Sequence, residues 1–195
     1  MRKILVETSA RHIHLCPASF AYLFGEDAQL EPRSPLSQPG QYASTSRLTL
    51  VGPKRSIERV IILGPLRKAD QVEISLTDAR TLGVNEVPVR ESGDTKNSAP
   101  IKIRNDQNGR EITISEGLII AKRHIHMTPA DAEEFQVKDK DVVAVRVMSP
   151  AGRSLIFDDV IVRVRADFAL AMHIDTDESN AAGLEGEVYG ELLKI

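Results

Sequence analysis

A tetrapeptide, Arg-His-Ile-His, occurs twice in this chain, at residues 11–14 and at residues 123–126. Each copy follows a short apolar stretch typical of a β-strand, at residues 4–6 and 118–121, and each precedes a short helical pattern. A motif that recurs together with its surroundings indicates that one structural unit is present twice. The repeat therefore predicts a chain built from two similar halves.

The residues after each motif predict a helix of about two turns. In the first copy, Pro17 fits the first helical position and Gly25 fits the end of the helix. In the second copy, Thr128 fits the cap, Pro129 the first helical position, and Asp131 the partner residue of a capping box.

Further matches extend the repeat along the chain. Turn-forming residues at 52–56 and 149–153 each separate two runs rich in Val, Ile and Leu, which favours a hairpin in each half. The halves align again farther on, where Glu73 of the first half matches His173 of the second.

Two segments have no counterpart in the other half. Residues 31–46 contain several prolines and a Pro-Gly pair, which predicts a loop over the surface. Residues 91–99 form a polar link between the halves. Apart from these segments, the pattern predicts a mainly β fold with short helices, arranged as two similar small barrels or sandwiches.

Composition and charge exclude several classes of protein. The 195 residues carry a net charge of -3, with 25 Lys and Arg scattered among 28 Asp and Glu, so we expect no nucleic-acid partner. The longest strongly apolar run, residues 60–63, is far shorter than the ~18 residues of a membrane helix, so we expect no membrane partner. The single cysteine, Cys16, and an N-terminal apolar run too short for a signal peptide favour the cytoplasm.

All five histidines of the chain lie in the matched motifs: His12, His14, His124, His126 and His173. Side chains two residues apart on a strand point to the same face, so each His-X-His pair directs two imidazoles toward one point. Two imidazoles on one face can bind a divalent metal. Zinc is the first expectation, and the ligand type leaves Co, Ni, Fe and Mn open.

Glu73 is the sixth candidate ligand because its position matches that of His173. Its alternative interpretation is an exposed glutamate on an amphipathic strand. Six ligands would serve two metals and leave the open coordination positions typical of catalytic sites. Asp175 and Asp177 could orient imidazoles as hydrogen-bond acceptors, although helix capping explains Asp177 equally well.

Three arginines and one cysteine lie close to these ligands in the sequence. Arg67 could hold an anion beside the metals, or it could be an ordinary surface arginine. Arg11 and Arg123 point away from the ligand face by strand parity, so we expect structural ion pairs for them. Cys16 keeps the parity of the first histidine pair, but Pro17 breaks the strand, which favours a buried structural thiol.

The motifs also carry a family resemblance. They are Arg-His-Ile-His twice, Gly-Pro-Lys-Arg at 52–55, Gln-Val-Glu-Ile at 71–74, Pro-Val-Arg-Glu-Ser-Gly-Asp at 88–94 and His-Ile-Asp at 173–175. In this order, and over nearly the whole chain, they resemble the propanediol-utilisation type of phosphotransacylase, the phosphate propanoyltransferases. The resemblance implies tandem pseudo-symmetric β-barrels, each capped by short helices, in an enzyme of propanediol degradation with two zinc ions. Such an enzyme interconverts a short-chain acyl-CoA (propanoyl-CoA or acetyl-CoA) plus phosphate with acyl phosphate plus CoA.

The resemblance also implies roles for single residues. One metal would be held by His124, His126, His173 and Glu73, and the other by His12 and His14. Arg67 would contact phosphate. Contacts to CoA would come from Thr8, Ser9, Ala10, Lys54 and Asn180.

The resemblance further implies interleaved domains, because the strand before each His-X-His pair packs in the barrel of the opposite half. The first barrel is then expected at residues 11–118, and the second at residues 1–10 plus 119–195. Family members in bacterial microcompartments carry an N-terminal targeting extension, whereas only eleven residues precede His12 here. We therefore expect a free cytoplasmic enzyme, with its oligomeric state, including a homo-oligomer, left open.

Three other functions remain open from the residues alone. A bicupin-like metal-dependent oxygenase or isomerase also uses His-X-His, a glutamate and a later histidine, but cupins place the glutamate only a few residues after the pair. A metal-dependent acyl hydrolase would use bound hydroxide in place of phosphate. A noncatalytic metal-stabilised interaction module would show closed coordination and no affinity for CoA.

Overall fold

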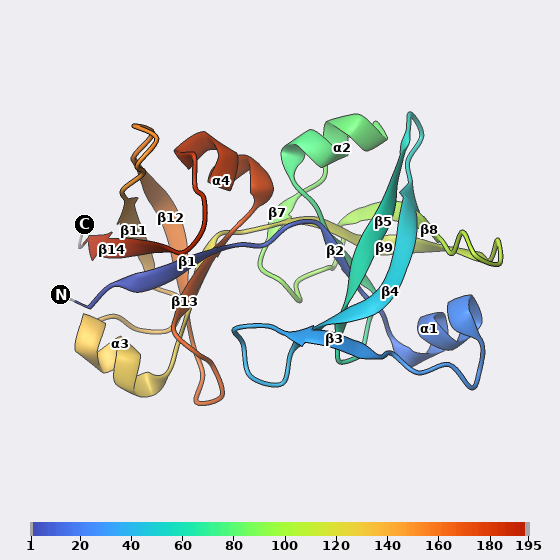
Figure 1. Ribbon diagram of the computed structural model, residues 1–195, viewed down its shortest axis with the longest axis horizontal. Helices are drawn as coiled ribbons and strands as arrows, with labels where there is room; N and C mark the ends of the chain where they lie inside the picture. Colours follow the sequence, from blue (N-terminus) through green and yellow to red (C-terminus); the bar gives the residue numbers. More distant parts are fainter. Residues whose placement is uncertain (1, 194–195) are drawn as a thin grey trace. The chain divides into compact units, whose positions relative to one another are not determined.

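The computed structural model describes residues 2–193, so Met1, Lys194 and Ile195 lie outside the described part of the chain. The fold is mainly β with short helices, and it contains two closed six-stranded barrels, as the sequence predicts (Figure 1). The chain divides into two compact units. We call Arg11–Leu36 with Gly40–Ala121 the N-barrel, and the described parts of Met1–Ala10, Ser37–Pro39 and Lys122–Ile195 the C-barrel. The bounds expected from the family resemblance were 11–118 for the first barrel and 1–10 plus 119–195 for the second.

The C-barrel is a closed ring of strands with two helices. Around the ring, the strands are β1 (Ile4–Thr8), β13 (Ala171–Ile174), β10 (His124–Met127), β12 (Leu155–Val164), β11 (Val142–Val147) and β14 (Val188–Leu193). The helices are α3 (Pro129–Phe135) and α4 (Thr176–Ala182). Strand β1 pairs in parallel with β13 and antiparallel with β14, so the first strand of the chain completes the barrel formed by its last third.

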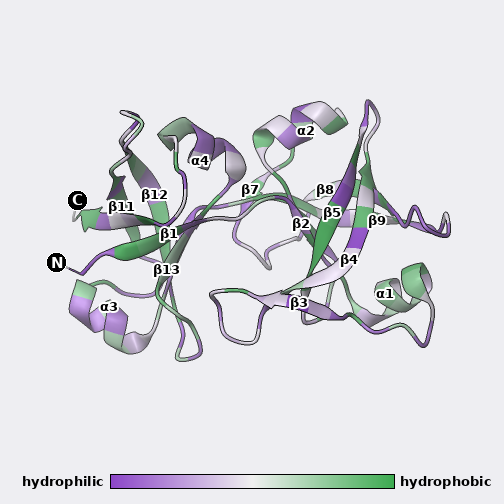
Figure 2. Ribbon diagram, viewed as in Figure 1, coloured by the Kyte–Doolittle hydropathy of each residue, from purple (hydrophilic) through white to green (hydrophobic). Residues whose placement is uncertain are grey.

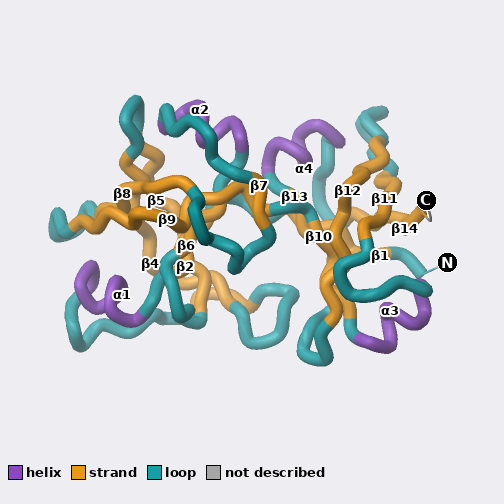
Figure 3. The backbone as a smooth tube through the Cα atoms, turned by 180° about the vertical axis from the view of Figure 1, so that it is seen from behind, coloured by secondary structure: helices purple, strands orange, loops and turns teal. Residues whose placement is uncertain are grey.

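The N-barrel repeats this plan. Its ring runs through β4 (Tyr42–Val51), β5 (Ser56–Gly64), β2 (His12–His14), β6 (Gln71–Glu73), β9 (Glu111–Ala121) and β8 (Ala99–Arg104), and β8 pairs back to β4. Two short strands, β3 (Pro32–Pro35) and β7 (Val89–Arg90), pair with β4 and β9. The helices are α1 (Pro17–Phe24) and α2 (Leu76–Leu82), and both are short, as Figure 3 shows.

The core of each barrel follows from the alternation of side chains on the strands. Ile13 and Ile125, the middle residues of the two His-X-His motifs, are 0% exposed and lie in the two separate hydrophobic clusters. Their neighbouring histidines therefore point to the opposite side of the strand. Figure 2 shows the hydrophobic colour along β1, whereas α3 carries hydrophilic colour. Within the described residues, no helix is long and apolar enough to cross a membrane.

The predicted helix signals and hairpins are confirmed. Pro17 is the first residue of α1, and Gly25 caps its end. Thr128 caps α3, with Pro129 first and Asp131 closing the capping box. The two predicted turns each join an antiparallel pair, β4 with β5 and β11 with β12.

The prediction of a simple surface loop at residues 31–46 is wrong in three respects, the first of which is that residues 42–46 lie in strand β4. Pro32 and Pro35 lie in strand β3, at the edge of the N-barrel sheet. An edge strand has a neighbour on one side only, and this is where a sheet tolerates proline, which lacks a backbone N–H donor. Gln38, farther along the segment, is buried at 4% exposure, and Ser37–Pro39 belong to the C-barrel. Proline and glycine content marked the irregular backbone correctly but gave no information about these distant contacts.

We predict that Ile125→Ala lowers the free energy of unfolding by about 2–5 kcal/mol, because it leaves a cavity in the C-barrel core. Urea denaturation followed by circular dichroism measures the change. Ile156→Ala is the matched control, because Ile156 is 52% exposed in the same barrel and should change stability by only about 0.5 kcal/mol. Equal shifts of the two urea midpoints would contradict the described core.

Candidate metal centres and active site

The N-barrel brings three potential ligands together on adjacent strands. His12 and His14 lie on β2, and Glu73 lies on β6 directly opposite His12 in the antiparallel ladder. His12 Nε2 lies 3.5 Å from Glu73 Oε2, and one potential ligand atom from each of the three residues lies within 4.8 Å of the others. All three residues are buried. We call this group the His-His-Glu trio.

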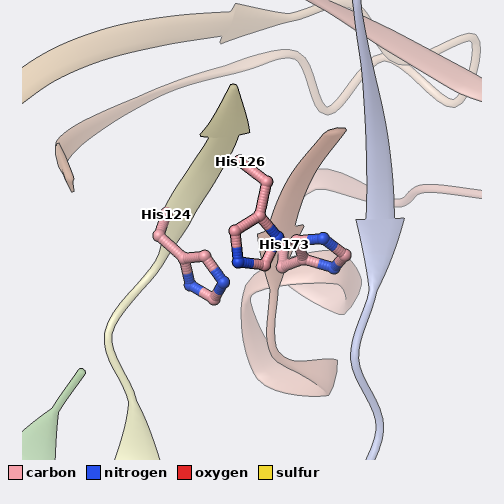
Figure 4. A group of neighbouring side chains, drawn as sticks. All are labelled: His124, His126 and His173. Carbon is pink, nitrogen blue, oxygen red and sulfur yellow. The ribbon is translucent and has the colours of Figure 1, made fainter. Parts of the chain in front are cut away.

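The C-barrel builds its own trio in the same way. His124 and His126 lie on β10, and His173 lies on β13 opposite His124. The three imidazoles face one another, with ring centroids 4.7 Å apart for His124 and His126 and 5.2 Å apart for His124 and His173 (Figure 4). Their potential ligand atoms also lie within 4.8 Å of one another. We call this group the three-histidine trio.

The surroundings hold one imidazole of each trio in the neutral form that metal binding requires. Burial lowers the pKa of His14 well below its usual value, and the nearby His12 and Arg67 lower it further. Burial, followed by the neighbouring His124 and His173, lowers the pKa of His126 to about 2. These two imidazoles are therefore neutral near pH 7.

Glu73 is held in its charged form. Burial raises the pKa of Glu73, but the facing His12 and a hydrogen bond from Ser92 outweigh this effect, so that the pKa lies well below its ordinary value. A buried carboxylate among imidazoles that is ionised at neutral pH is ready to bind a cation.

Both trios fit a divalent metal by a second criterion. The Nδ1 atoms of His14 and His126 are buried and have no hydrogen-bond partner among the described residues. Leaving a buried polar atom without a partner costs about 1–3 kcal/mol, so such atoms in a native site call for a ligand. Imidazole nitrogen and carboxylate oxygen are also common zinc ligands. Each trio therefore has the donors and the proximity needed to hold a metal, and one imidazole in each, that of His14 or of His126, is neutral.

The structure divides the ligands three and three. It places Glu73 with His12 and His14, as pure repeat symmetry predicts. This arrangement differs from the four-and-two division implied by the family resemblance, which assigned Glu73 to the three histidines of the C-barrel. The physical reason is the β2–β6 ladder, which holds Glu73 directly against His12.

A polar network connects Glu73 to Arg67. Ser92 Oγ donates to Glu73 Oε1 at 2.6 Å and accepts from Arg67 Nη1 at 3.3 Å. Gln71 Nε2 donates to the same Glu73 oxygen at 2.6 Å, and Gln71 Oε1 accepts from the backbone N–H of Gly93 at 2.8 Å. Arg67 therefore lies beside the His-His-Glu trio, where its positive charge is felt at His14.

Sequence reasoning assigned no role to Gln71 or Ser92. Gln71 lies two residues before Glu73, a spacing that puts both side chains on one face of β6, and this signal could have identified it. Ser92 belongs to the polar stretch at residues 91–99, which interrupts the repeat. The stretch was visible in the sequence, but its contact with Glu73 was not.

The arginines of the repeated motif form structural ion pairs, as predicted. Arg11 Nη2 lies 2.8 Å from Asp78, the third residue of α2, and Arg123 Nε lies 2.7 Å from Glu178, the third residue of α4. Each carboxylate also closes the capping box of its helix. In both barrels the motif arginine thus connects the His-X-His strand to the helix that follows Glu73 or His173, the third candidate ligand of each trio.

Asp175 and Cys16 act at helix starts. Asp175 is the cap of α4 and accepts from the backbone N–H of Glu178 at 2.8 Å, so capping falls to Asp175, whereas Asp177 lies within the first turn. Cys16 caps α1 and is half-buried, with Sγ 3.4 Å from Ser19 Oγ.

The residues expected to contact CoA fall in both units. In the C-barrel, Thr8 Oγ1 donates to Ser179 Oγ at 2.8 Å, which places the end of β1 beside α4 and next to exposed Asn180. Ser9 follows and donates its backbone N–H to Ile174 O at 2.7 Å, and Ala10 ends this segment of the unit. In the N-barrel, Lys54 lies exposed in the turn between β4 and β5.

The fold and the two trios define a double-barrel protein with two candidate metal centres. Comparisons with known proteins specify it further. A family model described as phosphate propanoyltransferase matches residues 5–185. A phosphate propanoyltransferase of Thermotoga maritima is 56% identical over 193 residues, covering 98% of this chain and 88% of that protein. One of Listeria monocytogenes is 50% identical over 189 residues, covering 97% and 86%. The chain belongs to the phosphate propanoyltransferase family and is an acyltransferase.

The lowered pKa of His126 predicts a pH dependence of stability in chelator-treated protein. Below the ordinary pKa of 6.5 the unfolded chain binds a proton that the folded imidazole, with a pKa of about 2, does not bind. Stability should therefore be complete above pH 6.5 and fall as the pH is lowered, by at most about 1.4 kcal/mol per pH unit for this group.

Urea midpoints at pH 7.5 and pH 5 measure this effect. His126→Gln removes the titrating group, so we expect this variant to lose less stability between the two pH values than the unsubstituted chain. An equal loss in both proteins would show that His126 is not buried as a neutral imidazole.

Proposed function

We propose that this acyltransferase interconverts a short-chain acyl-CoA plus phosphate with acyl phosphate plus CoA, using two zinc ions. The name of its relatives supports propanoyl-CoA as the substrate, and acetyl-CoA is the alternative acyl donor. A cytoplasmic location belongs to the proposal and is supported by the single cysteine.

The observation that carries this proposal is Arg67 beside the His-His-Glu trio. A guanidinium presents a rigid fork of donors that matches phosphate oxygens. The backbone N–H of Arg67 donates to Leu15 O at 2.8 Å, and Arg67 Nη1 donates to Ser92 Oγ, so the side chain of Arg67 is held next to Glu73. An arginine fixed in this place would bind phosphate and orient it for reaction.

The two trios would hold the metals. His12, His14 and Glu73 would bind one ion, and His124, His126 and His173 would bind the other. When bound, zinc supplies Lewis-acid stabilisation of the developing oxyanion and of the departing thiolate.

The reaction then needs no covalent enzyme nucleophile. An oxygen of the phosphate held by Arg67 forms a bond to the thioester carbonyl carbon, and the carbon–sulfur bond breaks. The products are acyl phosphate and the CoA thiolate, which takes up a proton to become the thiol. Holding phosphate beside the thioester raises its effective concentration and so favours its attack over that of water.

The residues expected to hold CoA support the proposal in part. In the C-barrel, Thr8 contacts Ser179, the residue before Asn180, and Lys54 of the N-barrel offers a positive charge for the phosphate groups of CoA.

We predict that the purified chain binds two zinc ions, and that His14→Ala and His126→Ala each bind only one. Each substitution removes a buried ligand from a different trio. Elemental analysis after dialysis against buffered zinc gives the stoichiometry. Cys16→Ser is the control and should retain two ions, since Cys16 belongs to neither trio. One ion in the unsubstituted chain would contradict the two-metal proposal.

We also predict that Arg67→Ala raises the KM for phosphate by at least about tenfold, because a charge-assisted contact of about 1.5–3 kcal/mol is lost. CoA release from propanoyl-CoA and acetyl-CoA, with and without phosphate, measures it. Lys68→Ala, at the exposed neighbouring position, is the matched control and should leave this KM unchanged. Metal-dependent release of CoA that ignores phosphate would instead identify a hydrolase.

A further inference from the structure

Residues Ser37–Pro39, which we call the strap, belong to the C-barrel, although the chain before and after them belongs to the N-barrel. Gln38 anchors the strap. Its Nε2 donates to Ala169 O at 2.9 Å, and its Oε1 accepts from the backbone N–H of Ala169 at 3.2 Å. Breaking either bond would leave a polar atom buried without a partner, so this amide fixes the strap to the chain between β12 and β13.

The strap also contacts a carboxylate beside a candidate metal ligand. Ser37 Oγ donates to Glu7 Oε2, and the same Glu7 oxygen lies 3.6 Å from His173 Nδ1. Glu7 and His173 are direct partners in the β1–β13 ladder, and Figure 4 shows the blue strand β1 beside His173. A carboxylate facing one nitrogen of a metal-binding imidazole fixes the orientation and the tautomer of the ring, so that the other nitrogen faces the metal.

The segment between β12 and β13, which Gln38 holds at Ala169, contacts a second histidine of the same trio. Phe168 immediately precedes Ala169, and its ring centroid lies 4.2 Å from that of His126. Arg165 lies over the same ring, 4.9 Å from its centroid. Because Gln38 holds Ala169, it also restrains the aromatic ring that packs against His126.

The N-barrel offers a parallel to this arrangement. There, Ser92 hydrogen-bonds to Glu73, the third ligand, and Ser92 comes from residues 91–99, which have no repeat counterpart. The strap comes from residues 31–46, the other segment without a counterpart. Each segment that breaks the repeat thus brings a serine hydroxyl to a carboxylate. In the N-barrel this carboxylate is the third candidate ligand itself, Glu73, and in the C-barrel it is Glu7, beside the third candidate ligand His173.

We propose that the strap positions the three-histidine trio for metal binding. Ser37 acts through Glu7 on His173. Gln38 acts through Ala169 and its neighbour Phe168 on His126. This inference rests on the proposed metal sites and adds the residues that orient one of them. The three residues Ser37, Gln38 and Glu7 are positioning residues, and neither Ser37 nor Gln38 would touch the metal.

The test measures zinc affinity in the full-length chain carrying His14→Ala, so that only the three-histidine trio offers three ligands. Competition with a chromophoric chelator gives the affinity. We expect Glu7→Gln to weaken zinc binding by about 10–100-fold, and Ser37→Ala and Gln38→Ala, which act through other residues, to weaken it by a smaller factor. Ser37→Thr keeps the hydroxyl and should restore the affinity, which a general packing role of the strap would not predict. Ser34→Ala, at an exposed position on β3, is the matched control and should bind as tightly as the parent.

The outcomes separate this inference from the proposed function. If the His14→Ala parent binds zinc and Ser37→Ala and Glu7→Gln bind it equally tightly, the proposed role of the strap is overturned, whereas the proposed function is not. Absence of zinc binding by the unsubstituted chain would overturn the proposed metal function and the strap's role with it. Thermal unfolding of the chelated proteins should be alike for Ser37→Ala and the parent, since Ser37 is exposed.

Discussion

The ladder between two short antiparallel strands determines the geometry of each candidate metal centre. A His-X-His pair supplies two imidazoles on one face, and the residue directly opposite the first histidine supplies the third ligand. Directly paired residues carry their side chains on the same face with Cβ atoms about 4.5–5.5 Å apart, so the ladder brings the ligands together without a loop. The closed barrels hold these short strands in register. The motif arginines then connect them to the helices behind, through Asp78 and Glu178.

The two trios differ in charge although they share one geometry. The N-barrel trio contains an ionised carboxylate, whereas the C-barrel trio contains only imidazoles. With the same divalent ion in both, the three-histidine centre would carry one more unit of positive charge. Arg163 and Arg165 add positive charge near His126. The substitution of histidine for glutamate at one repeat position therefore makes two chemically different centres from one duplicated plan.

The repeat made much of this structure predictable from the sequence. The helix caps and the hairpins depend on residues close together in the chain, and for these the predictions are confirmed. The match of His173 with Glu73, far along the chain, came from aligning the two halves of the repeat. The strand β3, the strap contacts and the roles of Ser92 and Gln71 were not predictable. They depend on pairings between residues far apart in sequence or on the tertiary packing of irregular segments, for which residue types carry little information. Repeat symmetry placed Glu73 beside His12 and His14, where the structure has it, whereas the family resemblance implied a place with the C-barrel histidines.

The order of the strands also affects how such a chain folds as it is synthesised. Strand β1, at residues 4–8, leaves the ribosome long before its neighbours β13 and β14, at residues 171–174 and 188–193. Until they emerge, β1 offers both of its edges to other strands, and edges of this kind promote mispairing and aggregation. The N-barrel, which needs nothing beyond residue 121, can close much earlier. During synthesis, the His-His-Glu trio can therefore form before His173, the last residue of the three-histidine trio, has been translated.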